Sequence, residues 1–301
     1  SAADAYLHPA MSRPNLTVLT DALATGVIVE AGRATGVRYL RRGVEEVARA
    51  EGEVILSAGA IGSPHLLLLS GIGPAEQLIE QGIRIVADSP GVGANLSDHP
   101  VVTAMWHTPR ATGLWEQAGP SQLGRWKFLH SGPLTSNLAE AGGFSRTMPS
   151  LAAPDLQWHV LPVPFQRQGL ADPSTRAISM LITLVAVASR GLVRLRSDDP
   201  RHKPAIDPGY LYATEDAEPL LSGLRMAREF AAAGPLAKHC TGELAPGQAV
   251  RTDDELREFI RRDLGTLYHP VGTCAMGGDS RLAASRLTSV VDPELRVRGV
   301  G

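Results

Sequence analysis

The segment at residues 59–73, GAIGSPHLLLLSGIG, constrains the fold of this chain more than any other. It follows a run of β-forming residues at 53–58, so the pattern predicts a strand, a glycine-flanked turn and then a helix with Pro64 near its start. Glycines before a helix allow a ligand to approach the backbone closely, and the first N–H groups of a helix can bind an anionic group. The sequence of this segment therefore predicts a strand–turn–helix that can border a cofactor.

Further blocks follow this segment in a fixed order, at residues 91–99, 140–144, 189–197, 206–210 and 268–273. Together with residues 59–73 they resemble the glucose–methanol–choline (GMC) oxidoreductases, flavoenzymes that oxidise alcohols, and within them the choline dehydrogenase-like members. The resemblance covers nearly the whole chain. It implies a mixed α+β / α/β fold, with part of an FAD-binding domain and a substrate domain whose mostly antiparallel sheet is flanked by helices.

The resemblance also divides the chain. It implies that residues 1–100 belong to the FAD-binding domain, 101–264 to the substrate-binding domain, and 265–301 to a truncated return to the FAD-binding domain. Residue patterns predict two short strands within 15–30. They predict further strands at 38–40, 53–56, 83–87, 155–161, 178–188 and 191–197. We expect the last two to pair around 189–191. Helices are predicted at 74–82, 215–233 and 252–264, the last with Thr252 and Glu255 as a capping box.

The resemblance does not extend to the family's first segment, and it covers only part of the last one. The family begins with a Gly-x-Gly-x-x-Gly turn that cradles the FAD pyrophosphate, yet the nearest match here, at 91–96, has Leu96 where the third glycine belongs. Residues 291–301 resemble only the start of the family's closing segment, which carries a second catalytic residue. We therefore expect the chain to be incomplete and inactive alone, with the missing segments supplied by a longer parent chain or a partner.

Composition excludes several other classes of function. The net charge of −2 is not typical of a protein that binds nucleic acid or an anionic membrane. No apolar run reaches the ~20 residues of a membrane helix. The two cysteines make no disulfide framework, no residue spacing resembles a metal site, and the start carries no signal peptide. We therefore expect a cytoplasmic protein with a small-molecule alcohol as substrate, no metal, no nucleic acid and no membrane span.

His269 is the predicted catalytic residue. Oxidation of an alcohol requires a base that takes the hydroxyl proton near neutral pH, which favours histidine. Pro270 holds residue 269 out of the α region, and Gly272 permits close packing of the backbone, so the imidazole can be held in one orientation. The match of Tyr-His-Pro-Val-Gly-Thr to the family's catalytic histidine implies the same role. His99, which ends another block, is interpreted as structural.

The remaining site residues follow from the resemblance or from chemistry. The predicted FAD contacts are Ala24, Gly59, Ala60, Gly62, Pro270 and Val271. The predicted substrate contacts are Glu140, Asn137 and His159. Glu140 can serve as a counter-charge for a quaternary ammonium, or it can be an ordinary glutamate paired with Arg146. Alternate arginines at Arg190, Arg194 and Arg196 are interpreted as a solvated strand face, and Cys274 as a core thiol.

These observations favour an FAD-dependent oxidoreductase that acts on CH–OH groups, with hydride transfer to flavin and His269 as base. Two alternatives stay open. One is a hydroxynitrile lyase-like member that holds FAD without redox turnover. The other is a flavin-free fragment, a scaffold or a subunit without activity of its own.

Overall fold

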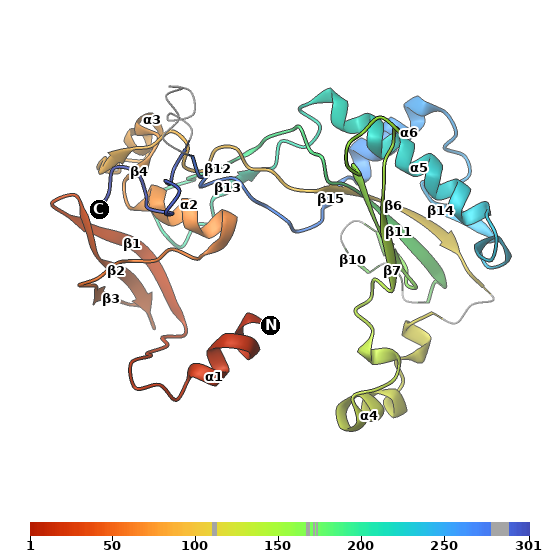
Figure 1. Ribbon diagram of the computed structural model, residues 1–301, viewed down its shortest axis with the longest axis horizontal. Helices are drawn as coiled ribbons and strands as arrows, with labels where there is room; N and C mark the ends of the chain where they lie inside the picture. The colour runs from red at the N-terminus through yellow and green to blue at the C-terminus, as the bar shows by residue number, and fades with distance from the viewer. Residues whose placement is uncertain (110–112, 167–168, 171, 173, 278–288) are drawn as a thin grey trace. The chain divides into compact units, whose positions relative to one another are not determined.

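A computed structural model describes residues 1–301 except 110–112, 167–168, 171, 173 and 278–288. The chain forms two compact units (Figure 1). Unit 1 comprises Ser1–Ala94, Val193–Ile206 and Thr273–Gly301, and unit 2 comprises Asn95–Leu192 and Asp207–Gly272. In the described ranges no helix has the length and apolar character needed to cross a bilayer.

Unit 1 holds a three-stranded antiparallel sheet in the order β1 (Ala22–Glu30), β2 (Arg33–Arg41) and β3 (Val44–Arg49). Helix α2 (Gly59–Leu69) packs against β1, and the buried Ser70 hydroxyl accepts the Val27 N–H at 2.8 Å. The core of the unit joins Leu67 and Leu68 of α2 to residues far along the chain, namely Ile72, Leu78, Val92, Leu195 and Val290. The other elements are η1 (Ala3–Leu7), α1 (His8–Ala10), β4 (Ile72–Gly73), α3 (Ala75–Glu80) and β5 (Ala87–Asp88).

The helix predicted near Pro64 is confirmed, and it begins earlier, at Gly59. The strand expected at 53–56 is wrong: these described residues form no ladder, and Ile55 is 75% exposed. A β run becomes a strand only where a neighbour pairs with it, and no described segment does so here. For the same reason residues 15–30 give one strand instead of two, and 83–87 contributes only the start of β5, which pairs with β4 in parallel.

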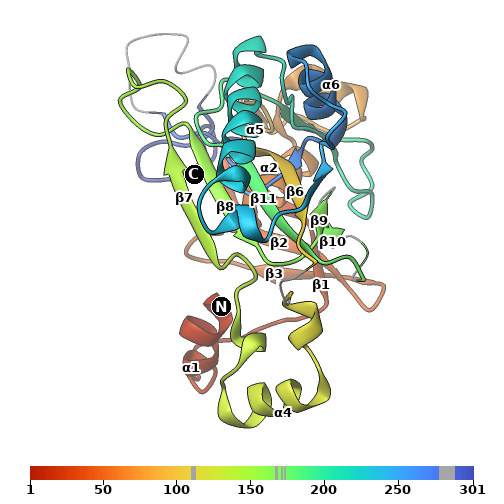
Figure 2. The same ribbon diagram turned by 90° about the vertical axis from the view of Figure 1, so that its right-hand side faces the viewer.

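Unit 2 is built on a six-stranded antiparallel sheet in the order β14–β6–β11–β8–β7, with β15 also paired to β6. Its strands are β6 (Pro100–His107), β7 (Ala141–Ser145), β8 (Leu156–Leu161), β11 (Ala177–Leu184), β14 (Gly242–Ala245) and β15 (Gly265–Thr266). Helices α5 (Ala217–Ala232) and α6 (Asp253–Asp263) pack on one face of this sheet (Figure 2). Their shared core includes Val102, Met180, Ile182, Leu224 and Phe259. The predicted mixed fold with a mostly antiparallel sheet and flanking helices is confirmed.

Strand β11 shows why one predicted pairing is wrong. It lies at the centre of the sheet, between β6 and β8, and nearly all of its side chains are buried. Both of its edges are therefore occupied, so the strand that follows, β12 (Leu192–Arg194), cannot fold back onto it. Strand β12 pairs instead with β13 (Ala205–Asp207). The segment Val193–Ile206 lies in unit 1.

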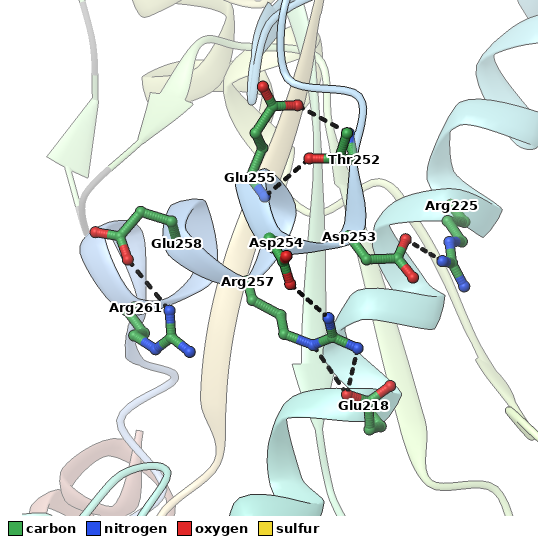
Figure 3. A network of polar contacts seen from close by, with 9 residues as sticks. All are labelled: Glu218, Arg225, Thr252, Asp253, Asp254, Glu255, Arg257, Glu258 and Arg261. Atoms are coloured by element: carbon green, nitrogen blue, oxygen red, sulfur yellow. Dashed lines mark hydrogen bonds and ion pairs between the residues drawn. The ribbon is translucent and has the colours of Figure 1, made fainter.

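The capping box predicted for α6 is confirmed (Figure 3). The Thr252 hydroxyl accepts the Glu255 N–H at 3.3 Å, and the Glu255 carboxylate accepts the Thr252 N–H at 2.8 Å. Arg257 of the same helix donates to Glu218 of α5 at 2.9 Å. Because these side chains lie at the surface, such ion pairs contribute little to stability, and the apolar contacts between α5, α6 and the sheet dominate.

The shorter elements of unit 2 connect the strands. They are η2 (Trp115–Gln117), α4 (Pro120–Leu129), η3 (Pro133–Thr135), β9 (Phe165–Gln166), β10 (Gly169–Leu170), η4 (Thr214–Asp216) and η5 (Leu236–Lys238).

Candidate active site

A buried carboxylate organises the part of unit 2 that contains His269. Asp98 is 6% exposed and immediately precedes His99 and strand β6. Its Oδ1 accepts the backbone N–H of His99 at 2.8 Å and that of His269 at 2.9 Å. Its Oδ2 accepts the hydroxyls of Tyr210 and Thr266. Four donors thus offset the cost of burying the charge, and they join segments more than a hundred residues apart in sequence.

The backbone of residues 265–272 is fixed by this arrangement. Strand β15 pairs with β6, and Ser97 and Val271 exchange two backbone hydrogen bonds of 2.9 and 2.8 Å. Gly272 has φ +97°, and a Cβ at that position would lie 2.3 Å from the Asn95 carbonyl oxygen, so only glycine fits. The local sequence therefore holds the main chain of His269 in one position, as the pattern around Pro270 predicts.

The imidazole of His269 is exposed and lies beside that of His99. The two Nδ1 atoms are 3.3 Å apart, and the ring centroids are 5.2 Å apart with an interplanar angle of 64°. Burial, and next the charge of His269, lower the pKa of His99 below its ordinary value. The same two causes lower the pKa of His159 on β8. Unit 2 therefore brings both His99 and His159 within electrostatic reach of His269.

The burial of Tyr210 has a related effect. Desolvation, and next its hydrogen bond to Asp98, raise the pKa of the Tyr210 hydroxyl well above its usual range. Tyr210 therefore stays protonated and acts as a donor to Asp98 at any physiological pH.

Two of the predicted substrate residues, Glu140 and Asn137, are exposed and precede the edge strand β7. Leu138 and Ala139, which lie between them, pack in the same apolar cluster as Leu267, two residues before His269. The Arg146 guanidinium donates to the Ala152 carbonyl at 3.1 Å. His159 is half-buried, and its Nδ1 is enclosed without a hydrogen-bond partner in the part of the chain that the structure describes.

The predicted cofactor residues fall into both units. Pro270 and Val271 belong to unit 2, where the backbone N–H and C=O of Val271 are already used by Ser97, which leaves its exposed side chain for any contact. Ala24, Gly59, Ala60 and Gly62 belong to unit 1.

The start of α2 is open in the way a cofactor site requires. Gly59 has φ +76°, and a Cβ there would have no neighbour within 4 Å. No side chain caps the helix at Ala58, so a side-chain partner does not occupy its first N–H groups. Ala24 is half-buried beside a bulge in β1, and the next residue, Thr25, carries a buried hydroxyl oxygen that lacks a partner among the described residues. These features fit a phosphate-bearing group such as the FAD that the resemblance implies.

Pro64 and Thr273 complete the structure of this helix. Proline lacks an N–H, so Pro64 cannot bond the carbonyl of Ala60 four residues earlier. The hydroxyl of Thr273, which is 1% exposed, donates to that carbonyl at 2.6 Å. The last residue of the Tyr-His-Pro-Val-Gly-Thr block thus satisfies a polar group that the glycine-rich segment leaves open.

Sequence reasoning missed Asp98, Tyr210 and Thr266, and it assigned His99 only a structural role. A signal was present, since His-Pro occurs at 269–270 within one family block and at 99–100, where another block ends. Residues before proline favour extended backbone, so two such segments are suited to lie side by side as these do.

Comparison with known proteins gives a consistent result. Two family models described as GMC oxidoreductase match residues 1–101 and 187–301. Over 307 residues the chain is 40% identical to an alcohol dehydrogenase [acceptor] of Pseudomonas putida, which covers 100% of this chain and 54% of that protein. Over 311 residues it is 40% identical to an oxygen-dependent choline dehydrogenase of Sinorhizobium medicae, with coverage of 100% and 54%.

Solved structures agree with these relatives. A formate oxidase from Aspergillus oryzae RIB40, from a study of FAD modification, superposes with a TM-score of 0.87 at 26% identity over 97% of this chain and 56% of its own. The pyridoxine 4-oxidase from Mesorbium loti gives a TM-score of 0.84 at 27% identity over 100% and 55%. The chain spans about half the length of the curated relatives it matches.

Proposed function

The chain belongs to the GMC oxidoreductase family, and from this premise we propose that it takes part in FAD-dependent oxidation of the CH–OH group of an alcohol. The names of the relatives, an alcohol dehydrogenase and a choline dehydrogenase, support this reaction class. In the proposed reaction bound FAD accepts the hydride from the substrate carbon. The groups proposed to hold it in unit 1 are Gly59, Ala60 and Gly62 at the N-terminus of α2, together with Ala24 of β1.

His269 is the proposed proton acceptor. An imidazole titrates near neutral pH, and its exposed ring can reach a substrate hydroxyl. The anchoring of its backbone by Asp98 limits the orientations of the ring, and such positioning is what a general base needs. Asp98 does not compete for this role, because its two oxygens accept four hydrogen bonds and it is buried.

The proposed substrate contacts are His159, Glu140 and Asn137. His159 of β8 is the cross-strand partner of Leu181 of β11, and it lies within electrostatic reach of His269. Glu140 and Asn137 are exposed, so they are accessible to a substrate and suit its polar end.

The observation that carries the proposal is the Asp98-anchored His269 in the block that matches the family. Replacement His269→Ala in the native FAD-loaded protein should lower turnover by at least ~10²-fold with flavin content unchanged. The exposed His239→Ala serves as the matched control and should retain full turnover. Parental turnover in His269→Ala would remove the assignment.

Spectroscopy separates the two alternatives. Under anaerobic conditions an alcohol substrate should bleach the flavin absorption band, whereas a lyase-like member would leave it unchanged. A colourless, flavin-free native protein would favour a scaffold or subunit.

A further inference from the structure

His99 and His269 are held together by one carboxylate oxygen. The backbone N–H groups of both residues donate to Oδ1 of Asp98, at 2.8 and 2.9 Å. A backbone bond from the Leu267 N–H to the His99 carbonyl, 3.0 Å long, ties the same two segments together. The main chains of the two histidines are therefore held side by side, and their Nδ1 atoms lie 3.3 Å apart.

Two facing ring nitrogens can form a hydrogen bond only if one of them carries the hydrogen and the other a lone pair. If His99 donated, a neutral His269 would carry its own hydrogen on Nε2 and could not accept a proton there. If His269 donates through Nδ1, its Nε2 keeps a free lone pair. The tautomer of His269 thus decides whether its outer nitrogen can act as a base.

We propose that His99 is a positioning residue that accepts a hydrogen bond from Nδ1–H of His269 and thereby holds Nε2 of His269 unprotonated as the catalytic base. This inference rests on the proposed function of His269. It assigns a chemical role to His99 that burial or packing alone would not require.

The surroundings of His99 support its part as acceptor. Burial and the neighbouring His269 lower the pKa of His99, so it is neutral near pH 7 and has a lone pair to offer. Titratable groups near the pair in the described part of the chain include Asp98, Tyr210, His159 and Tyr268, which directly precedes His269. Asp98 contacts the backbone of both histidines and not their rings, and Tyr210 donates to Asp98, so neither supplies a competing partner for the two Nδ1 atoms.

The test measures the tautomer directly on the 301-residue chain and needs neither flavin nor turnover. In ¹⁵N-histidine-labelled protein at pH 7, two-bond ¹H–¹⁵N correlation distinguishes protonated from unprotonated ring nitrogens. The signals of His269 are assigned by their loss in His269→Gln. We expect Nδ1 of His269 to be protonated and Nε2 to be unprotonated. A hydrogen on Nε2 of His269 in the parent protein would overturn the proposal without any variant of His99.

Two variants of His99 then separate positioning from packing. The side-chain amide of His99→Asn keeps an acceptor near the place of Nδ1, whereas His99→Leu has none. The Nδ1–H tautomer of His269 should persist in His99→Asn and be lost in His99→Leu, with the backbone spectrum of unit 2 otherwise unchanged. Persistence of that tautomer in His99→Leu would overturn the proposal. The base role of His269 itself is tested apart from this, by turnover of His269→Ala.

Discussion

At the scale of single residues, the most informative side chain is one that takes no part in the proposed chemistry. Asp98 is buried and accepts two backbone N–H groups and two hydroxyls. A buried carboxylate that loses its hydrogen-bond partners lowers the stability of the fold far more than a surface carboxylate does. The low dielectric of the interior strengthens each hydrogen bond and raises the cost of an unpaired charge. Asp98 therefore sets the position of His269 through the backbone.

We predict that Asp98→Asn lowers the free energy of unfolding by about 1–3 kcal/mol, because neutral hydrogen bonds replace charge-assisted ones and the amide presents a donor to two hydroxyls. All four tryptophans lie within 95–192, so tryptophan fluorescence during urea unfolding reports on unit 2. The control is Glu258→Gln, which removes an exposed ion pair with Arg261 and should change stability by less than about 0.5 kcal/mol. Equal effects of the two changes would contradict the role of Asp98.

A second residue-scale prediction concerns pH. Burial, and then the charge of His269, lower the pKa of His159, so near the ordinary value of 6.5 the folded state binds fewer protons than the unfolded state. Stability must then fall as the pH drops from 7 to 5. We expect His159→Phe to reduce this fall, as measured by the urea midpoint of tryptophan fluorescence at both pH values.

The exposed His239→Gln is the control for that experiment and should keep the parental pH dependence. A steeper dependence in His159→Phe would show that the sign is wrong. Burial also lowers the pKa of His99, which lies in unit 2 as well, so part of the acid sensitivity should remain in the variant.

At the scale of elements, the sequence predicts features that depend on neighbouring residues, such as helix caps, better than it predicts which strands pair. The capping box of α6 depends on residues three apart, so Thr252 and Glu255 predict it fully. The partner of β12 depends on which sheet edges are free, and that is decided by β6 and β8, far away in sequence. In the same way the Tyr-His-Pro block predicts a site role for His269 from local sequence. The contact of Asp98 with His269 depends on the pairing of β15 with β6, which the sequence does not predict.

Helix α2 gives the prediction at this scale. Thr273→Val should destabilise α2 by about 1 kcal/mol, because the Ala60 carbonyl loses its donor. In a Pro64→Ala background the alanine N–H can bond that carbonyl, so the same Thr273→Val change should cost much less. Amide hydrogen exchange of α2 measures both, since unit 1 contains no tryptophan.

Thr273→Ser keeps a hydroxyl and is the matched control for that cycle. The expected interaction is non-additivity between positions 64 and 273. If the two changes add independently, the hydroxyl of Thr273 does not replace the missing proline N–H.

At the scale of the whole molecule, family blocks predict the family and the fold class of the chain. The resemblance indicates a cofactor part and a substrate part, and the mixed fold that it implies is confirmed. It does not indicate that the chain passes between the two units after residues 94, 192, 206 and 272, because such crossings depend on which distant strands pair. The assignment of FAD and substrate to particular units stays a prediction.

The last prediction follows from the separation of the cores. The cluster around Leu68 and Ile72 lies wholly in unit 1, and the clusters around Ile182 and Leu181 lie wholly in unit 2. Apolar burial is the main source of cooperativity, so each unit should unfold in its own transition. Urea unfolding followed by far-ultraviolet circular dichroism, which reports on both units, should not coincide with that followed by tryptophan fluorescence. The Asp98→Asn variant should move the fluorescence-detected transition and the matching part of the circular dichroism curve, and leave the rest of that curve in place. A shift of the whole circular dichroism curve would show that the units unfold as one.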